Sequence, residues 1–283
     1  MLGLLGPSVA LIALFVVGPV GYALWLSLTN KTLTGFGAQT PKFVGLQNYR
    51  QLLTSSDFLA SMGRTGQFIF FSAIVGQFLL GMLAAALLTK STVRAKGAFG
   101  GAILLPMVVP EVVASLAWAS MLAPGRLGTV NRALEPFGVA PLAWLQAHPM
   151  SALIVVNTWR GIAFAMIMFQ AAIEGISDDL MEAARIDGAG PRQVFRYITV
   201  PLIRGPIFLF LLLTTITTAS VFGLIYFLTR GGPGGKTEVT SIYIYEHSFA
   251  FFQLGLGSAA SVILLVVVLV LGLTYVRLAK VEV

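Results

Sequence analysis

Two ionisable side chains lie deep inside otherwise apolar runs of this sequence. Glu111 falls in a run near residues 97–122, and Arg160 falls in a run near 150–173. A charge in such a stretch is costly unless it has a partner or faces water, so it indicates a functional site by default. The two side chains could line a solute pathway, where the planar Arg160 guanidinium suits phosphate or hydroxyl groups. The alternatives are a structural ion pair, or an Arg160 side chain that extends outward beside Trp159.

A row of hydroxyl side chains marks another apolar run, near residues 205–229. The candidates for the same pathway are Thr214, Thr217 and Thr218, together with Asn157 on the run that holds Arg160. Hydroxyl and amide groups can hydrogen-bond a polyol solute. They can equally bond to their own backbone or join neighbouring helices. Both interpretations stay open at this point.

The sequence gives no support for catalysis. It contains no cysteine and only two histidines, which excludes thiolate zinc sites, cysteine nucleophiles and a disulfide framework. Residues Gly231–Thr237 resemble a phosphate-binding loop, but Arg230 stands where that loop requires its first glycine. No triad, paired-carboxylate or metal-binding pattern stands in the apolar runs. We therefore expect that the chain is not an enzyme and binds no metal or cofactor of its own.

The composition indicates an integral membrane protein. The chain is 57% hydrophobic and 10% charged, whereas a soluble domain carries about 25% charged residues. So little charge cannot cover a water-facing surface, and most of the surface must face lipid. The net charge of +7 fits basic loops beside anionic lipid. The basic residues are scattered, which argues against nucleic-acid binding.

Apolar runs long enough to cross a bilayer, which takes roughly 20 residues, divide the chain. They lie near 3–28, 63–89, 97–122, 150–173, 205–229 and 253–278, and we expect a single transmembrane domain over residues 1–283. Pro106 and Pro110 should kink the third run. The first run is longer than a signal-peptide core, which predicts a retained helix. It has no basic residue before it, so we expect that the natural start could lie upstream of Met1.

Residues 174–204 form a charged segment between the fourth and fifth runs. Ser177–Asp179 can cap a helix, and Glu182 follows at the spacing of a capping box. Ala183 and Ala184 allow another surface to approach closely, and Gly188 can supply a left-handed stop. Physical chemistry alone leaves two interpretations: an amphipathic connector on the lipid headgroups, or a docking surface.

The spacing in this segment resembles the EAA loop of binding-protein-dependent ABC importer permeases. Glu182-Ala183-Ala184 is followed after three residues by Gly188, and after nine more by Ile198, with Val200-Pro201 close behind. Val200 stands where the family pattern has leucine. Asp187-Gly188-Ala189 resembles the carbohydrate-type members, which carry maltose, other sugars or glycerol-3-phosphate.

Further stretches extend the resemblance over nearly the whole chain. They are Phe43–Tyr49, Leu104–Pro106 and Leu228–Pro233. One departure concerns Gly223, because such chains often have an acidic or amide residue near this position. Any role of that side chain in the pathway is therefore in doubt here.

The resemblance implies an all-α fold with six transmembrane helices and a cytoplasmic coupling helix, that of a type I ABC importer permease. The residues that would couple it to an ATPase are Glu182, Ala183, Ala184, Asp187, Gly188 and Ala189. The implied partners are a second homologous permease subunit, two ABC ATPase subunits that bind ATP and Mg²⁺, and an external solute-binding protein. The implied solute is a sugar or related polar molecule.

We expect the chain in the inner (plasma) membrane of a prokaryote with both termini in the cytoplasm. That orientation places the short basic segments at 90–96 and 277–280 inside, as the positive-inside rule favours. The alternative function is a six-span secondary transporter or channel that works without ATPase subunits. Against it, the sequence has no visible inverted repeat and no second acid in the apolar runs for proton coupling.

Overall fold

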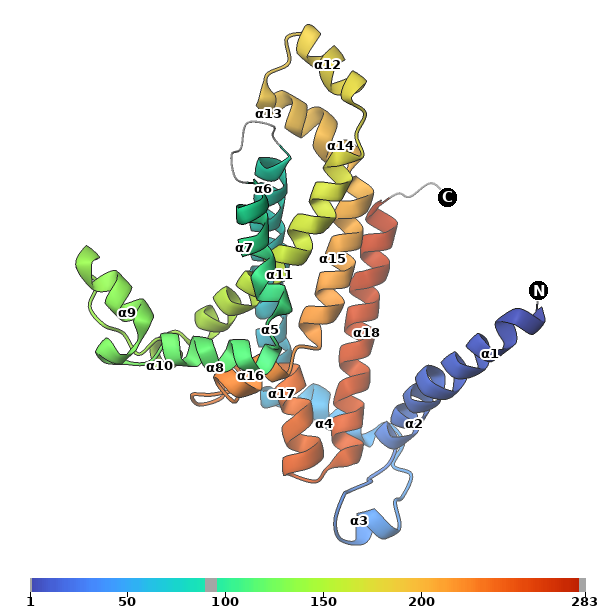
Figure 1. Cartoon of the computed structure of the whole chain (residues 1–283). Helices are drawn as coiled ribbons and strands as arrows, with labels where there is room; N and C mark the ends of the chain where they lie inside the picture. Colours follow the sequence, from blue (N-terminus) through green and yellow to red (C-terminus); the bar gives the residue numbers. More distant parts are fainter. Residues whose placement is uncertain (1, 90–95, 280–283) are drawn as a thin grey trace. The chain divides into compact units, whose positions relative to one another are not determined.

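The computed structural model describes residues 2–89 and 96–279, and every regular element in those ranges is a helix (Figure 1). This confirms the all-α fold class. The basic segment expected around 90–96 lies, except for Lys96, outside the described residues. The chain divides into two compact units, and the divisions fall within the helix α5, in the loop before α17 and within the helix α18.

Unit 1 comprises residues up to Thr65 together with Glu238–Val267. Its elements are α1 (Leu2–Ile12), a π-helical turn (Ala13–Val17), α2 (Gly18–Ser27), α3 (Phe36–Gln39), α4 (Gln47–Thr54), most of α5 (Ser56–Phe68), α17 (Thr240–Tyr245), a second π-helical turn (Glu246–Ala250) and the first half of α18 (Leu254–Ala279). Leu52 and Phe58 pack against Tyr243 in its core. The Asn48 amide donates to the carbonyls of Ser27 and Thr29, which fixes the end of α2.

Unit 2 comprises Gly66–Thr237 and the end of α18. After α5 come a π-helical segment (Ile69–Gln77), α6 (Phe78–Leu88), α7 (Lys96–Val108), α8 (Glu111–Met121), a 3₁₀ turn (Gly125–Leu127), α9 (Thr129–Leu134), a 3₁₀ turn (Glu135–Phe137), α10 (Trp144–Ala147), α11 (Pro149–Glu174), α12 (Asp178–Ile186), α13 (Pro191–Val194), a π-helical turn (Phe195–Thr199), α14 (Val200–Leu202), α15 (Arg204–Ala219) and α16 (Gly223–Leu228). Phe169 and Phe210 lie at its core.

Four continuous helices in the described residues are long and apolar enough to cross a membrane. They are Gly6–Ser27, Ser56–Leu88, Pro149–Glu174 and Leu254–Ala279. Two bent pairs pass the same test, α7 with α8 at 104° and Pro191–Leu202 with α15 at 67°. The total is six if each bent pair forms one span.

The third apolar run is more than kinked, because its helix stops at Val108 and restarts at Glu111. Pro110 has no N–H and disfavours helical conformation in the residue before it, so the helix breaks there. Pro106 is tolerated inside α7.

The fifth run is also interrupted, where a continuous helix over 205–229 was expected. α15 ends at Ala219, and α16 begins only at Gly223. The Ser220 hydroxyl at the break donates to the carbonyls of Ile216 and Thr217. Side-chain hydroxyls that bond to helix carbonyls in this way compete with the backbone and weaken the helix.

Small residues let the long helices of unit 2 approach each other closely. A Cβ atom at Gly81 of α6 would lie 2.2 Å from the Cβ of Ala165 on α11. A Cβ at Gly161 of α11 would lie 2.1 Å from the carboxamide carbon of Gln77. At Gly81 the neighbouring backbone lies close enough to exclude a side chain, whereas Gly161 leaves the space that the Gln77 carboxamide occupies; small residues at such contacts are typical of helix packing in membranes.

Candidate functional site

The charged segment between α11 and α15 folds as a short, well-terminated helix. α12 has Asp178 and Asp179 in its first turn and Arg185 in its last, which complements the helix dipole at both ends. Ser177 occupies the N-cap position but makes no side-chain capping hydrogen bond. The capping box expected at this start is therefore absent. The next helix, α13, does have a side-chain bond at its start: the N–H of its N-cap residue Gly190 donates to the Gln193 side-chain oxygen at 2.8 Å.

The end of α12 is a Schellman motif. Gly188 has a φ of +79°, and its N–H donates to the Arg185 carbonyl, while the Ala189 N–H donates to the Ala184 carbonyl. These are the two bonds that define the motif, and the positive φ explains why glycine stands at 188. The stop expected from the sequence is therefore confirmed, and the turn after α12 is rigidly defined.

Most of α12 is accessible. Within this helix only Ala184 is buried, whereas Glu182 and Ala183 are exposed and the Ile186 side chain is 86% exposed. Figure 1 shows α12 beyond the ends of α11 and α15. The exposed face of α12 is therefore free to contact another protein.

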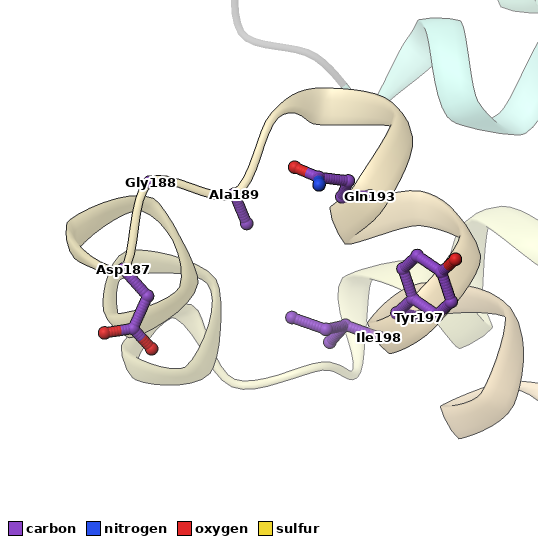
Figure 2. A pocket seen from close by; sticks show the side chains of 6 residues that line it. All are labelled: Asp187, Gly188, Ala189, Gln193, Tyr197 and Ile198. Carbon is purple, nitrogen blue, oxygen red and sulfur yellow. The ribbon is translucent and has the colours of Figure 1, made fainter.

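A hollow lies beside the turn that follows α12 (Figure 2). It is lined by Asp187, Gly188, Ala189, Gln193, Tyr197 and Ile198. Figure 2 shows the Ala189 and Ile198 side chains pointing into the hollow. Three of the coupling residues expected from the sequence thus share one concave surface with the following helix.

The two charges that lie in apolar runs of the sequence are close together in the structure. Arg160 Nη1 on α11 lies 3.8 Å from Glu111 Oε2 on α8, an ion pair too long for a hydrogen bond. The side chains are 23% and 34% exposed, and Arg160 Nε is buried without a hydrogen-bond partner among the described residues. This geometry supports the ion-pair interpretation. It also leaves the Arg160 Nε–H without a hydrogen-bond acceptor in the part of the chain that the structure describes.

The hydroxyl and amide candidates are engaged in helix packing. Thr214 on α15 donates to the Gln77 side-chain oxygen at 2.8 Å, and Gln77 donates to the Asn157 carbonyl at 3.1 Å. The Asn157 amide donates to the Ser72 hydroxyl at 2.9 Å. Thr214 and Asn157 are both buried. Their hydrogen bonds join three helical segments, which is the packing interpretation.

The remaining hydroxyls give a mixed picture. Thr218 is buried, whereas Thr217 is exposed and donates back to the carbonyls of Leu213 and Thr214. Ser72 was not a sequence candidate. Ser72 reaches Asn157 because residues Ile69–Gln77 form a π-helix, and no residue pattern in the sequence predicted this wider turn. Within the described residues no three His, Cys, Asp or Glu side chains form a metal-binding group.

Comparisons with known proteins agree over nearly the whole chain. The family model described as "Binding-protein-dependent transport system inner membrane component" matches residues 77–281. The chain is 32% identical over 277 residues to the trehalose/maltose transport system permease protein MalF of Thermococcus litoralis, covering 97% of this chain and 91% of that protein. It is 34% identical over 282 residues to the sn-glycerol-3-phosphate transport system permease protein UgpA of Yersinia pestis, covering 98% and 92%.

A solved structure shares the fold. A chain of a bacterial ABC transporter involved in the import of the acidic polysaccharide alginate matches with a TM-score of 0.81 and 24% identity, covering 98% of this chain and 94% of that one. A second crystal structure, of a bacterial alginate ABC transporter in complex with its alginate pentasaccharide-bound periplasmic protein, matches equally well, with a TM-score of 0.81.

Proposed function

The chain belongs to the family of binding-protein-dependent transport system inner membrane components and is a permease subunit of an ABC importer; from this premise we propose that it forms half of the translocation pathway for a sugar or related polar solute. The names of its relatives, which carry trehalose/maltose or sn-glycerol-3-phosphate, support this solute class. Transport by such a subunit needs no reaction centre in this chain. ATP and Mg²⁺ would bind to partner ATPase subunits.

The observation that carries the proposal is the form of α12. It is exposed along most of its length, its acids and Arg185 complement its dipole, and a Schellman motif fixes its end. A helix that transmits force between subunits has to dock without deforming, because its own flexibility would absorb the movement. We assign α12 and the turn Asp187–Ala189 to an ATPase docking surface, with Glu182 and Ala183 on the accessible face.

Ala184 has a different part in this surface. Its side chain is buried, so it packs α12 against the rest of the chain, and its exposed neighbours would contact the ATPase. A methyl side chain allows this close packing, because a larger side chain at 184 would push α12 away from the residues it packs against.

Arg160 is the residue that we assign to the solute. Its side chain is partly exposed, so the guanidinium can offer donors to hydroxyl or phosphate oxygens. The Glu111 carboxylate lies 3.8 Å from the guanidinium as its counter-charge. Thr217 is a further candidate because it is exposed, whereas Thr214, Thr218 and Asn157 are buried.

The assembly that we propose has one further permease subunit, homologous to this chain, two ABC ATPases on the cytoplasmic side and an external solute-binding protein. Both termini would lie in the cytoplasm of a prokaryote, in its inner membrane. The alginate importer captured with its periplasmic protein supports a partner of the last kind.

The test substitutes Gly188→Asp in the assembled transporter and compares it with Gly138→Asp. Both glycines have a positive φ, +79° and +76°, and both have open space where a Cβ atom would be added, so the backbone cost is matched. Only Gly188 lies at α12. We expect Gly188→Asp and Glu182→Lys to leave membrane insertion intact and to abolish the stimulation of MgATP hydrolysis by the loaded binding protein.

The assay supplies the binding protein with maltose, trehalose or sn-glycerol-3-phosphate and measures MgATP hydrolysis in lipid nanodiscs. Equal stimulation in the Gly188→Asp and Gly138→Asp complexes would contradict docking through α12. Solute uptake by the purified chain without any ATPase subunit would contradict the importer assembly itself.

A further inference from the structure

The first turn of α16 is held by a side chain from another helix. The initial N–H groups of a helix have no partner within it, and the Leu224 N–H is such a group because α16 begins at Gly223. It donates to Glu111 Oε1 at 2.5 Å across a sequence separation of 113 residues. Glu111 is itself the first residue of α8, where the helix dipole favours a carboxylate. One carboxylate therefore serves the starts of two helices.

Gly223 provides the space that this carboxylate occupies. A Cβ atom at position 223 would lie 3.2 Å from Glu111 Oε1 and 3.3 Å from its carboxyl carbon. Such distances are tighter than ordinary van der Waals contact, so a methyl group at 223 would push the carboxylate of Glu111 by a few tenths of an ångström. Glycine is favoured here by its neighbour, since its backbone is in the ordinary negative-φ range of the helix.

Both of these helices follow a break in their apolar run. α8 turns away from α7 by 104°, and α16 is separated from α15 by the interruption after Ala219. A broken helix loses the continuous backbone bonds that would fix the direction of its second half. α8 and α16 also pack along each other, so the bond between Glu111 and Leu224 lies at their common beginning.

From these observations we infer that Glu111 is a positioning residue, which locks α8 to α16 and thereby sets the place of Arg160, and that Gly223 leaves the space for its carboxylate. Oε1 binds the backbone of α16, while Oε2 faces the guanidinium of Arg160 on α11. The carboxylate thus joins three helices. The inference concerns the internal architecture of unit 2 and stands apart from the identity of the solute.

Hydrogen exchange at the Leu224 amide tests the lock directly. The measurement uses the assembled transporter in nanodiscs without solute, with fragmentation that isolates this amide. In Glu111→Ala the amide loses its charged acceptor, and we expect roughly 10- to 100-fold faster exchange. Gly223→Ala should produce a smaller acceleration in the same direction, because its methyl group pushes the carboxylate away from the amide by a few tenths of an ångström.

Three further variants separate the lock from general destabilisation. Glu111→Gln keeps a carbonyl acceptor and should stay within roughly threefold of the natural chain. Glu111→Ala combined with Gly223→Asp moves the carboxyl group to the other side of the same space and should restore most of the protection. Gly205→Ala adds a methyl group in open space at the start of α15 and serves as the control.

Unchanged exchange in both Glu111→Ala and Gly223→Ala would overturn the inference. So would acceleration in Gly205→Ala equal to that in Gly223→Ala, which would indicate loosening of the whole unit. Should Glu111→Ala fail to assemble, Gly223→Ala and Glu111→Gln decide the question by the same measurement. Failure of the natural assembled transporter to import the solute, with Leu224 protection still lost in Glu111→Ala, would count against the proposed function and leave the lock standing.

Discussion

Substituting Gly81 by alanine adds a single methyl group at the tightest described approach between α6 and α11. The new Cβ would lie 2.2 Å from the Cβ of Ala165, and 3.1 Å and 3.2 Å from Ala165 backbone atoms. Two methyl carbons need about 3.5–4.0 Å, so the helices must separate or bend. Ala165 belongs to the middle of α11, which cannot move aside without disturbing the core around Phe169 and Phe210.

The expected change in the free energy of unfolding follows from two opposing effects. Alanine in place of glycine favours a helix by roughly 1 kcal/mol, whereas overpacking a close-packed interior costs about 1–3 kcal/mol and occasionally more. The backbone contacts place Gly81 at the upper end of the cost, which leaves a net loss of about 2 kcal/mol. Gly66, on the same continuous helix, has open space where a Cβ atom would be added and should gain up to about 1 kcal/mol as alanine.

The two variants should therefore differ by about 3 kcal/mol, although each adds the same methyl group to the same long helix. With a midpoint change of about 2–4 °C per kcal/mol for a chain of this size, the melting temperatures should differ by roughly 6–12 °C. Tryptophan fluorescence during heating in nanodiscs measures this. Adding Ala165→Gly to Gly81→Ala should recover part of the loss. Equal melting temperatures for Gly81→Ala and Gly66→Ala would refute the close contact.

Three other regions give specific predictions. The Asn131 side chain donates to the carbonyls of Ala123, Gly125 and Leu142 and accepts from the Leu142 N–H and the Trp144 indole. Asn131→Asp removes the donors, so trypsin should cleave at the exposed Arg126 several-fold faster. Unchanged cleavage would contradict this prediction. The fully buried Thr237 hydroxyl donates to Thr229 Oγ1 and the Gly232 carbonyl; Thr237→Val should cost about 1–3 kcal/mol, read from the melting temperature, with the exposed Thr54→Val as the control. Burial raises the pKa of Glu238 and of Glu246 above 4.5, and like charge between them raises the pKa of Glu238 further. A raised folded-state pKa gives a stabilising contribution that is full below pH 4.5 and is lost as pH rises through the raised values. Thermal stability should therefore fall over that window, and Glu238→Gln should flatten the fall; an equal slope in the variant would exclude Glu238 as the cause.

The sequence contains the information on α12 because that information is local. The Asp178–Asp179 start, the small residues and the Gly188 stop all act within a few positions, and each has a known effect on a helix. The break at Pro110 was partly visible for the same reason. The break after Ala219 was not, since a run of apolar and hydroxyl residues is compatible with an unbroken helix, and Thr217 makes the same kind of backbone bonds as Ser220 without ending α15.

Contacts between helices that are distant in the sequence could not be predicted from local patterns in this way. Glu111 and Arg160 were recognisable as costly charges, but the acceptor role of Glu111 toward Leu224 depends on two helix breaks and their register. Gly223 in the sequence indicated only that a side chain was missing. In the structure the carboxylate of Glu111 fills the space that a side chain at 223 would take. Likewise, Ser72 and Gln77 reach Asn157 and Thr214 together because a π-helix brings residues five apart toward one side, where an α-helix would separate them.

The Gln77 network also explains how movement at α12 can reach the rest of unit 2. α12 lies in the chain between α11 and α15, so a partner that displaces it pulls on both helices at once. Gln77 donates to the Asn157 carbonyl on α11 and accepts from Thr214 on α15. Because these buried bonds would be costly to break, the two helices are held to the same third helix and should shift as one body. The proposed docking surface at one end of α11 and the Glu111–Arg160 pair near its middle are thus connected through buried hydrogen bonds within unit 2.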